Sequence, residues 1–171
     1  TARRKKDVLR RIEKMGLARP RDLEVYGVTR AQLARLVQEG LVIRQARGVY
    51  ASAHHAPTAG HTLAQVAKRV PGGVICLLTA LRFHGLTTQS PAEVWLALPE
   101  RSRRPRLEYP RLRVARFSGA SLTEGIEEHR VEGVTVRVYS AAKTVADCFK
   151  FRNKVGVDVA VEALREFNRR H

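Results

Sequence analysis

Apolar residues recur at helical spacing in two segments at the start of the chain. Residues 3–16 predict an amphipathic helix, because their apolar residues would share one face. These residues are Val8, Leu9, Ile12 and Met15. Pro20 suits the first turn of a second helix, which Gly27 would end. The apolar contacts of this second helix would come from Leu23, Val25 and Tyr26.

The segment from Thr29 to Tyr50 has the clearest pattern in the chain. Thr29 is followed three residues later by Gln32, which is the capping-box pattern of a helix start. Gly40 suits the left-handed position that follows the end of a helix. Three apolar residues between these signals would face a core: Leu33, Leu36 and Val37. We therefore predict a third helix here.

Two short apolar runs follow this helix and predict a β-hairpin. They are residues 41–43 and 48–50, with the polar residues 44–47 between them. Three short helices and a hairpin predict a winged helix-turn-helix domain over residues 1–53. Residues 54–60 are small or polar and include Pro57, so they predict a linker.

The remaining residues, 61–171, mix helical and strand patterns and predict a C-terminal α+β domain with a small antiparallel sheet. Helices are expected at residues 62–70, 74–84, 141–152 and 157–169, and strands at residues 93–98, 112–117, 126–131 and 134–139. Residues 74–84 are almost wholly apolar and predict the central buried helix. Glu132-Gly133 predicts a two-residue hairpin turn. The last helix would bury Val157, Val161, Leu164 and Phe167.

Positive charge dominates the composition and bears on the choice of partner. The chain has 32 Lys and Arg against 16 Asp and Glu, a formal net charge of +16. Residues 1–53 alone carry 13 basic and five acidic residues. A surplus of this size favours a polyanion, and nucleic acid is the commonest. The alternative is an arginine-rich surface that is merely solvated.

The third predicted helix and the hairpin carry the residue types that suit double-stranded DNA. Arginine can bridge two acceptors on guanine, and glutamine can do the same on adenine. On the helix the candidates are Arg30, Gln32, Arg35 and Gln38. On the hairpin they are Arg44 and Arg47, which would meet phosphates or a minor groove, and Tyr50. The alternative is a protein-docking module with solvated arginines.

Two further basic clusters predict secondary contacts with phosphates. The first is Arg3, Arg4, Lys5 and Lys6 at the start of the chain. The second includes Arg101, Arg103, Arg104 and Arg106 in a segment broken by prolines. Such arginine runs suit a nucleic-acid backbone, although a solvated loop is the alternative for the second cluster.

Motifs for catalysis, metal binding and membrane insertion are not found in the sequence. We therefore expect a cytoplasmic protein that is not an enzyme and has no cofactor. Cys76 and Cys148 lie in apolar stretches and are expected to be buried reduced thiols. His54, His55 and His61 lie close together without the spacing of a known zinc motif, so we interpret them as linker histidines and expect no metal site. Trp95 is expected in the core rather than as a stacking platform.

Four segments together resemble the AbiEi family of antitoxins from type IV toxin–antitoxin systems. They are VTRAQLARLVQEGLVIRQARGVYAS, ICLLTALRFHGLT, EVWLALP and VEGVTVRVYSAAKTVADCFKFR. The resemblance implies a bacterial transcriptional repressor whose winged helix binds inverted repeats in its own promoter, with possible self-association on DNA. It implies DNA-binding roles for Arg30, Gln32, Arg35, Arg44, Arg47 and Tyr50.

The resemblance also implies that the C-terminal domain provides antitoxicity against a nucleotidyltransferase-like toxin, without a stable complex being required. Two alternatives stay open at this point. One is a protein-interaction module that docks the toxin or another regulatory partner. The other is a solitary transcriptional regulator without a toxin.

Overall fold

The computed structural model describes residues 2–171, which form two compact units. The N-terminal unit contains the chain up to Pro71 together with Arg130–Thr135. The C-terminal unit contains Gly72–His129 and Val136–His171. The predicted domain boundaries, with a linker at residues 54–60, stay a prediction. Among residues 2–171, no helix is both long and apolar enough to cross a membrane.

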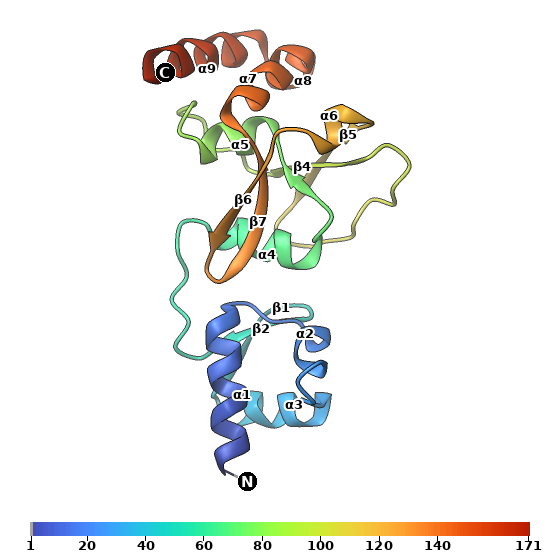
Figure 1. Ribbon diagram of the computed structural model, residues 1–171, viewed down its shortest axis with the longest axis vertical. Helices are drawn as coiled ribbons and strands as arrows, with labels where there is room; N and C mark the ends of the chain where they lie inside the picture. The colour runs from blue at the N-terminus through green and yellow to red at the C-terminus, as the bar shows by residue number, and fades with distance from the viewer. Residues whose placement is uncertain (1) are drawn as a thin grey trace. The chain divides into compact units, whose positions relative to one another are not determined.

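Three helices and a two-stranded antiparallel sheet open the N-terminal unit (Figure 1). The elements are α1 (Ala2–Met15), α2 (Pro20–Glu24), α3 (Arg30–Gln38), β1 (Val42–Ala46), β2 (Val49–Ser52) and α4 (His61–Arg69). An isolated bridge between Ala18 and Tyr50 pairs the α1–α2 connection with β2. This order of elements is compatible with a winged helix-turn-helix.

The core of this unit follows the predicted pattern except in α2. Its buried members come from α1, α2, α3, β1 and the two connections between these helices: Ile12, Ala18, Leu23, Val28, Leu33, Leu36 and Val42. The prediction that Val25 and Tyr26 pack inward is wrong, since Val25 is 82% exposed and Tyr26 is 48% exposed. The helix ends at Glu24, so both residues lie in the outward turn before Gly27. The Arg11 guanidinium instead stacks on the Tyr26 ring, 4.2 Å from its centroid.

The predicted start of α3 is confirmed. The Thr29 hydroxyl accepts a hydrogen bond from the Gln32 amide, and the Gln32 side chain accepts one from the Thr29 amide. The hairpin differs from its prediction, because β1 continues through Arg44 to Ala46. Its turn is therefore Arg47-Gly48 rather than the whole polar run, and Gly48 has the positive φ that this turn requires.

Asp22 makes a charged contact that links α2 to α4 within the N-terminal unit. Its carboxylate accepts hydrogen bonds from Lys68 Nζ at 2.7 Å and from the Arg19 backbone amide at 2.8 Å. Burial alone would raise the pKa of Asp22, but the hydrogen bonds from Lys68 and Arg19 outweigh it and hold the pKa below its ordinary value. The ionised carboxylate of Asp22 is therefore the form that stabilises the folded protein.

We expect Asp22→Asn to lower the free energy of unfolding at neutral pH by about 2 kcal/mol, because charge-assisted hydrogen bonds are lost. The pKa is lower in the folded state, so this stabilisation is present above the unfolded pKa and is lost as pH falls through the folded value. Urea titrations at neutral and acidic pH should show the two proteins converging in acid. Asp7→Asn, on an exposed aspartate of α1, is the control. A difference independent of pH would contradict this assignment.

A five-stranded mixed sheet, in the order β5-β4-β3-β7-β6, organises the second half of the chain. The strands are β3 (Val74–Ile75), β4 (Val94–Pro99), β5 (Leu112–Phe117), β6 (Ile126–Val131) and β7 (Val134–Tyr139). The predicted small antiparallel sheet is wrong, because β5 runs parallel to β4 and β7 runs parallel to β3. The helices are α5 (Leu77–Phe83), α6 (Ala120–Thr123), α7 (Ala141–Lys150), α8 (Arg152–Val155) and α9 (Val157–Arg170).

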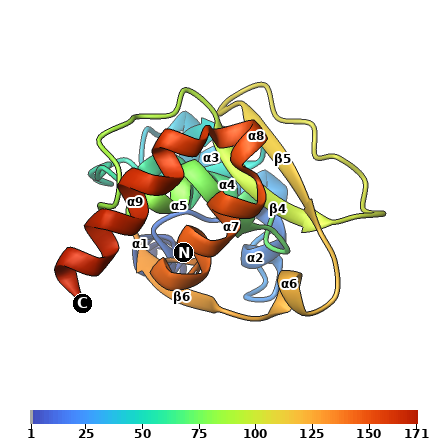
Figure 2. The same ribbon diagram turned by 90° about the horizontal axis from the view of Figure 1, so that it is seen from above.

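Two predicted helices need correction. Residues 74–84 are not one helix, because Val74 and Ile75 form β3 and pair with β4, which leaves only α5 helical. Residues 141–152 were also predicted as one helix. Instead, α7 ends at Lys150, and α8 begins at Arg152 as a separate helix. Helix α9 packs against α7, which also contacts α5, and Figure 2 shows these three helices together.

The buried face of α9 differs in part from its prediction, although Phe167 packs against the core as expected. The buried residues of α9 are Val159, Ala160 and Ala163, whereas Val157 is 53% exposed and Leu164 is 38% exposed. The small alanines allow a close approach to α7, which explains why this face turns inward.

The expected core residues of the C-terminal unit are confirmed. Trp95 is 5% exposed and contributes to the core, and the Arg113 guanidinium lies 4.6 Å from the centroid of its ring. Cys76 and Cys148 are buried free thiols. Burial raises the pKa of both thiols, that of Cys148 to about 12. Both thiols are therefore protonated at neutral pH and poorly nucleophilic.

Candidate nucleic-acid interface

Helix α3 presents a polar face opposite its buried one. Leu33 and Leu36 are buried, so the positions between and beyond them turn outward. Arg30, Arg35 and Gln38 are exposed. The Arg30 guanidinium lies 3.6 Å from the Glu24 carboxylate, and Arg30 is 82% exposed. A pair this exposed contributes little stability, so it would give way readily to a phosphate.

Gln32 occupies a different position from its neighbours on α3. It is partly buried, and its side-chain oxygen accepts the Thr29 amide hydrogen at 2.9 Å. The capping role holds that oxygen at the helix start, so only the side-chain amide hydrogens are available for another acceptor. Gln32 is thus less free to bridge adenine than the sequence pattern alone suggested.

A groove of about 250 Å³ runs between α1 and α3 in the N-terminal unit. Its walls include Arg4, Lys5, Gln32 and Arg35. Lys5 Nζ lies 2.5 Å from the Glu39 carboxylate across this groove. The structure thereby brings two members of the N-terminal basic cluster beside the polar face of α3.

The other two members of that cluster are also exposed. All four residues lie in the first turns of α1: Arg3, Arg4, Lys5 and Lys6. The Arg4 guanidinium donates a 3.4 Å hydrogen bond to the Gly27 carbonyl, beside the turn that precedes α3. The start of α1 and the start of α3 therefore present cations on one part of the N-terminal unit.

The hairpin candidates divide into exposed arginines and a partly buried tyrosine. Arg44 and Arg47 are exposed, on β1 and in its turn. Tyr50 packs against the core of the N-terminal unit, and its backbone pairs with Ala18. A DNA contact from Tyr50 stays a prediction, with less support than the contacts of the two arginines.

The arginine segment between β4 and β5 lies in the C-terminal unit and has no regular secondary structure. Arg101, Arg103, Arg104 and Arg106 are all exposed. Arg104 donates a 3.0 Å hydrogen bond to the Leu112 carbonyl, and Arg116 donates to the carbonyls of Pro99 and Ser102. Part of this positive charge thus holds the segment against β5 and β4.

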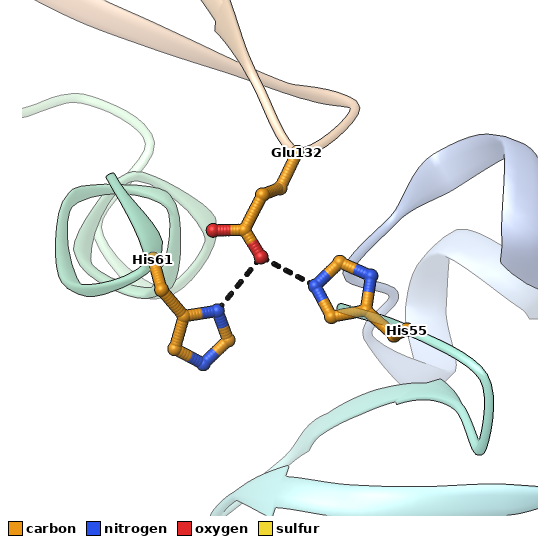
Figure 3. A group of neighbouring side chains, drawn as sticks. All are labelled: His55, His61 and Glu132. Atoms are coloured by element: carbon orange, nitrogen blue, oxygen red, sulfur yellow. Dashed lines mark hydrogen bonds and ion pairs between the residues drawn. The ribbon is translucent and has the colours of Figure 1, made fainter. Parts of the chain in front are cut away.

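A second group of side chains gathers around Glu132 in the N-terminal unit (Figure 3). One carboxylate oxygen, Oε1, accepts hydrogen bonds from His55 Nε2 and from His61 Nδ1, the latter at 2.9 Å. The other oxygen accepts the Thr58 hydroxyl at 3.0 Å. Burial would raise the pKa of Glu132, but hydrogen bonds from His61, His55 and Thr58 hold the pKa below its ordinary value.

This group could not be predicted from the sequence, because its members are far apart in the chain. Glu132 lies 77 residues after His55 and 71 residues after His61. His54 is exposed, as expected for a linker histidine, whereas the rings of His55 and His61 are largely enclosed. The only local signal was Glu132 itself, at a turn position where asparagine, aspartate or glycine is usual.

Residues 6–53 match the protein family described as transcriptional regulator, AbiEi antitoxin. The matched segment runs from within α1 to the residue after β2, so it includes α3 and the hairpin. It supports the resemblance to AbiEi antitoxins noted from the sequence. A search of curated proteins gave no match to this chain.

Proposed function

We propose that the N-terminal unit is a winged helix-turn-helix that binds double-stranded DNA, with α3 in the major groove and the β1–β2 hairpin as the wing. The observation that carries this proposal is the exposed polar face of α3 within the segment that matches a regulator family. Basic residues at the start of α1 lie beside that face, and the hairpin of the same unit carries two further exposed arginines. Such a distribution is the electrostatic footprint of a DNA-binding surface.

Within this proposal the exposed residues take different roles. Arg35 lies in the middle of α3 and contacts base edges, and Gln38 lies one turn further on. Arg30 at the helix start and Arg44 and Arg47 of the hairpin contact phosphates or the minor groove. Gln32 mainly holds the helix start and donates its amide hydrogens to an acceptor on the DNA.

The basic clusters outside α3 and the hairpin supply phosphate contacts, which position the protein without reading sequence. In the N-terminal unit these are Arg3, Arg4, Lys5 and Lys6. In the C-terminal unit they are Arg101, Arg103 and Arg106, with Arg104 contributing less because it is hydrogen-bonded to Leu112. Binding that depends on many such contacts weakens steeply as salt is raised.

We further propose that the protein is a cytoplasmic transcriptional repressor that binds inverted repeats in its own promoter and acts as the antitoxin of a type IV toxin–antitoxin system. The support is the family match over residues 6–53 and the wider resemblance of the chain. Inverted repeats call for two copies on the DNA, with half-sites about 34–36 Å apart if they are separated by one helical turn.

A promoter-reporter experiment tests the regulatory proposal. The DNA upstream of the gene for this chain drives a reporter, and the protein is supplied from a second plasmid. We expect wild-type protein to lower reporter output and a variant with Arg30, Arg35 and Arg44 replaced by alanine to restore it. Unchanged output with wild-type protein, at verified expression, would contradict autorepression.

The antitoxin proposal has its own test. Co-expression with a nucleotidyltransferase encoded beside this gene should rescue growth, and no stable complex need form. Co-elution of the two purified proteins would favour the alternative of a module that docks the toxin. Failure to rescue growth, with repression intact, would leave a solitary regulator.

A further inference from the structure

We propose that His55, His61 and Glu132 form a binding site for one divalent transition-metal ion, with Zn²⁺ the best match. The three side chains converge from the segment after β2, the first residue of α4 and the β6–β7 turn (Figure 3). All three belong to the N-terminal unit. The site is separate from the polar face of α3 and does not depend on its function.

The spacing of the donor atoms fits a metal ion. One ligand atom from each of the three residues lies within 4.8 Å of the other two. The ring nitrogens that face the carboxylate are His55 Nε2 and His61 Nδ1. A tetrahedral ion with nitrogen and oxygen ligands at about 2.0–2.2 Å holds its donors roughly 3.3–3.6 Å apart, so the hydrogen-bonded side chains need to separate only slightly to admit it.

The surroundings of the three ligands also suit a metal. His61 Nε2 lies 3.1 Å from the Gln65 side-chain amide, and Gln65 is buried. When His61 Nδ1 binds a metal, its ring proton moves to Nε2, and the Gln65 carbonyl oxygen can accept it after an amide flip. The Thr58 hydroxyl fixes the second carboxylate oxygen in the same way. Both outer partners orient ligands, as they do in known metal sites.

The β6–β7 turn determines where the Glu132 carboxylate lies. The φ of Glu132 is +50°, a left-handed conformation that a side chain larger than asparagine or aspartate rarely adopts. Gly133 follows it with φ +77°, so the pair forms a tight hairpin turn. The Glu132 side chain at this turn is 1% exposed, so a nearly buried carboxylate lies between the two imidazoles.

The chemistry of the donors selects the metal. Two imidazoles and one carboxylate suit Zn²⁺, whereas Mg²⁺ and Ca²⁺ prefer oxygen ligands throughout. Three protein ligands leave one position for water or another small ligand. Binding would join the β6–β7 turn to the segment around α4 and would stabilise the N-terminal unit by mass action.

The test is a Zn²⁺ titration of the untagged, metal-stripped protein by calorimetry, paired with thermal melts. We expect one Zn²⁺ per chain and a melting temperature that rises with Zn²⁺ concentration. His55→Gln, His61→Gln and Glu132→Gln should each weaken binding by about 100-fold or more, beyond the 10–100-fold typical of lost outer partners. His54→Gln is the matched control, because this exposed histidine adjoins His55 without contacting Glu132, and it should leave binding unchanged.

Cobalt provides a readout that a loss of folding would not imitate. Co²⁺ bound by two imidazoles and a carboxylate should give visible absorption bands in the wild type and in His54→Gln, and Zn²⁺ should displace it. The proposal is overturned if wild-type protein binds no Zn²⁺, which would make the group a hydrogen-bonded cluster only. It is also overturned if the folded His55→Gln and His61→Gln variants bind Zn²⁺ as tightly as the wild type does.

Discussion

Replacing Arg35 by alanine should weaken binding to the promoter inverted repeat by roughly 5–150-fold, which corresponds to the 1–3 kcal/mol of one bidentate arginine–guanine contact. Arg35 is exposed at the centre of α3, and the capping hydrogen bonds of Thr29 and Gln32 fix the helix beneath it. The loss should be smaller on scrambled DNA, because phosphate contacts remain. Fluorescence anisotropy with both duplexes measures the two effects.

Arg165→Ala is the matched control for this substitution. Arg165 is an exposed arginine on α9, in the C-terminal unit, so its removal lowers the net charge equally without touching α3. It should change both affinities by less than about twofold, since only one exposed charge outside α3, screened by salt, is lost. If Arg35→Ala behaved like Arg165→Ala, α3 would not be the helix that contacts bases.

Gly16→Ala should lower the free energy of unfolding by roughly 3 kcal/mol or more. Gly16 ends α1 at φ +70°, and a Cβ atom there would overlap the carbonyl oxygen of Glu132. A Cβ at Gly133 would in turn lie 2.7 Å from the Met15 carbonyl oxygen. The backbones of the end of α1 and of the β6–β7 turn therefore lie in close contact, and no side-chain rotation can relieve the overlap.

Gly40→Ala separates the effect of the overlap from that of the backbone conformation. Gly40 also has φ +70°, but no atom lies within 4 Å of its would-be Cβ. Its substitution should lower the free energy of unfolding by only about 1–2 kcal/mol. Urea titrations followed by far-UV circular dichroism provide the comparison, because the sole tryptophan, Trp95, lies in the C-terminal unit. Equal losses would mean that Gly16 does not approach Glu132.

Features encoded by neighbouring residues were predictable from the sequence. The capping box at Thr29 and Gln32 involves residues three apart, and the structure contains both of its hydrogen bonds. The Glu132-Gly133 turn is equally local, and it has the two positive φ values of its type. The buried face of α3 followed from the spacing of Leu33 and Leu36.

Features that depend on distant partners were not predictable from the sequence. Val74 and Ile75 belong to the same apolar run as α5, which follows them. Only their pairing with β4 and β7 makes them a strand. On α9, Val157 and Leu164 lie on one apolar face, and Val159, Ala160 and Ala163 lie on another. Packing against α7 determines which of the two faces is buried.

The candidate sites also contain some features that the sequence predicts and others that only the fold reveals. The exposed arginines of α3 could be named from helical periodicity, because a core face implies an opposite face. The capping of Gln32 and the inward packing of Tyr50 required the fold. The histidine group required a residue more than 70 positions away, which no spacing motif could supply.

The measurement that tests the central claim most directly is the equilibrium affinity of the wild-type protein for two duplexes at physiological salt. One duplex contains the inverted repeat from its own promoter, and the other has the same length and composition in scrambled order. A sequence-specific winged helix should prefer the inverted repeat by about 10³-fold or more. Equal affinity for the two duplexes would contradict the proposal that α3 reads a DNA sequence.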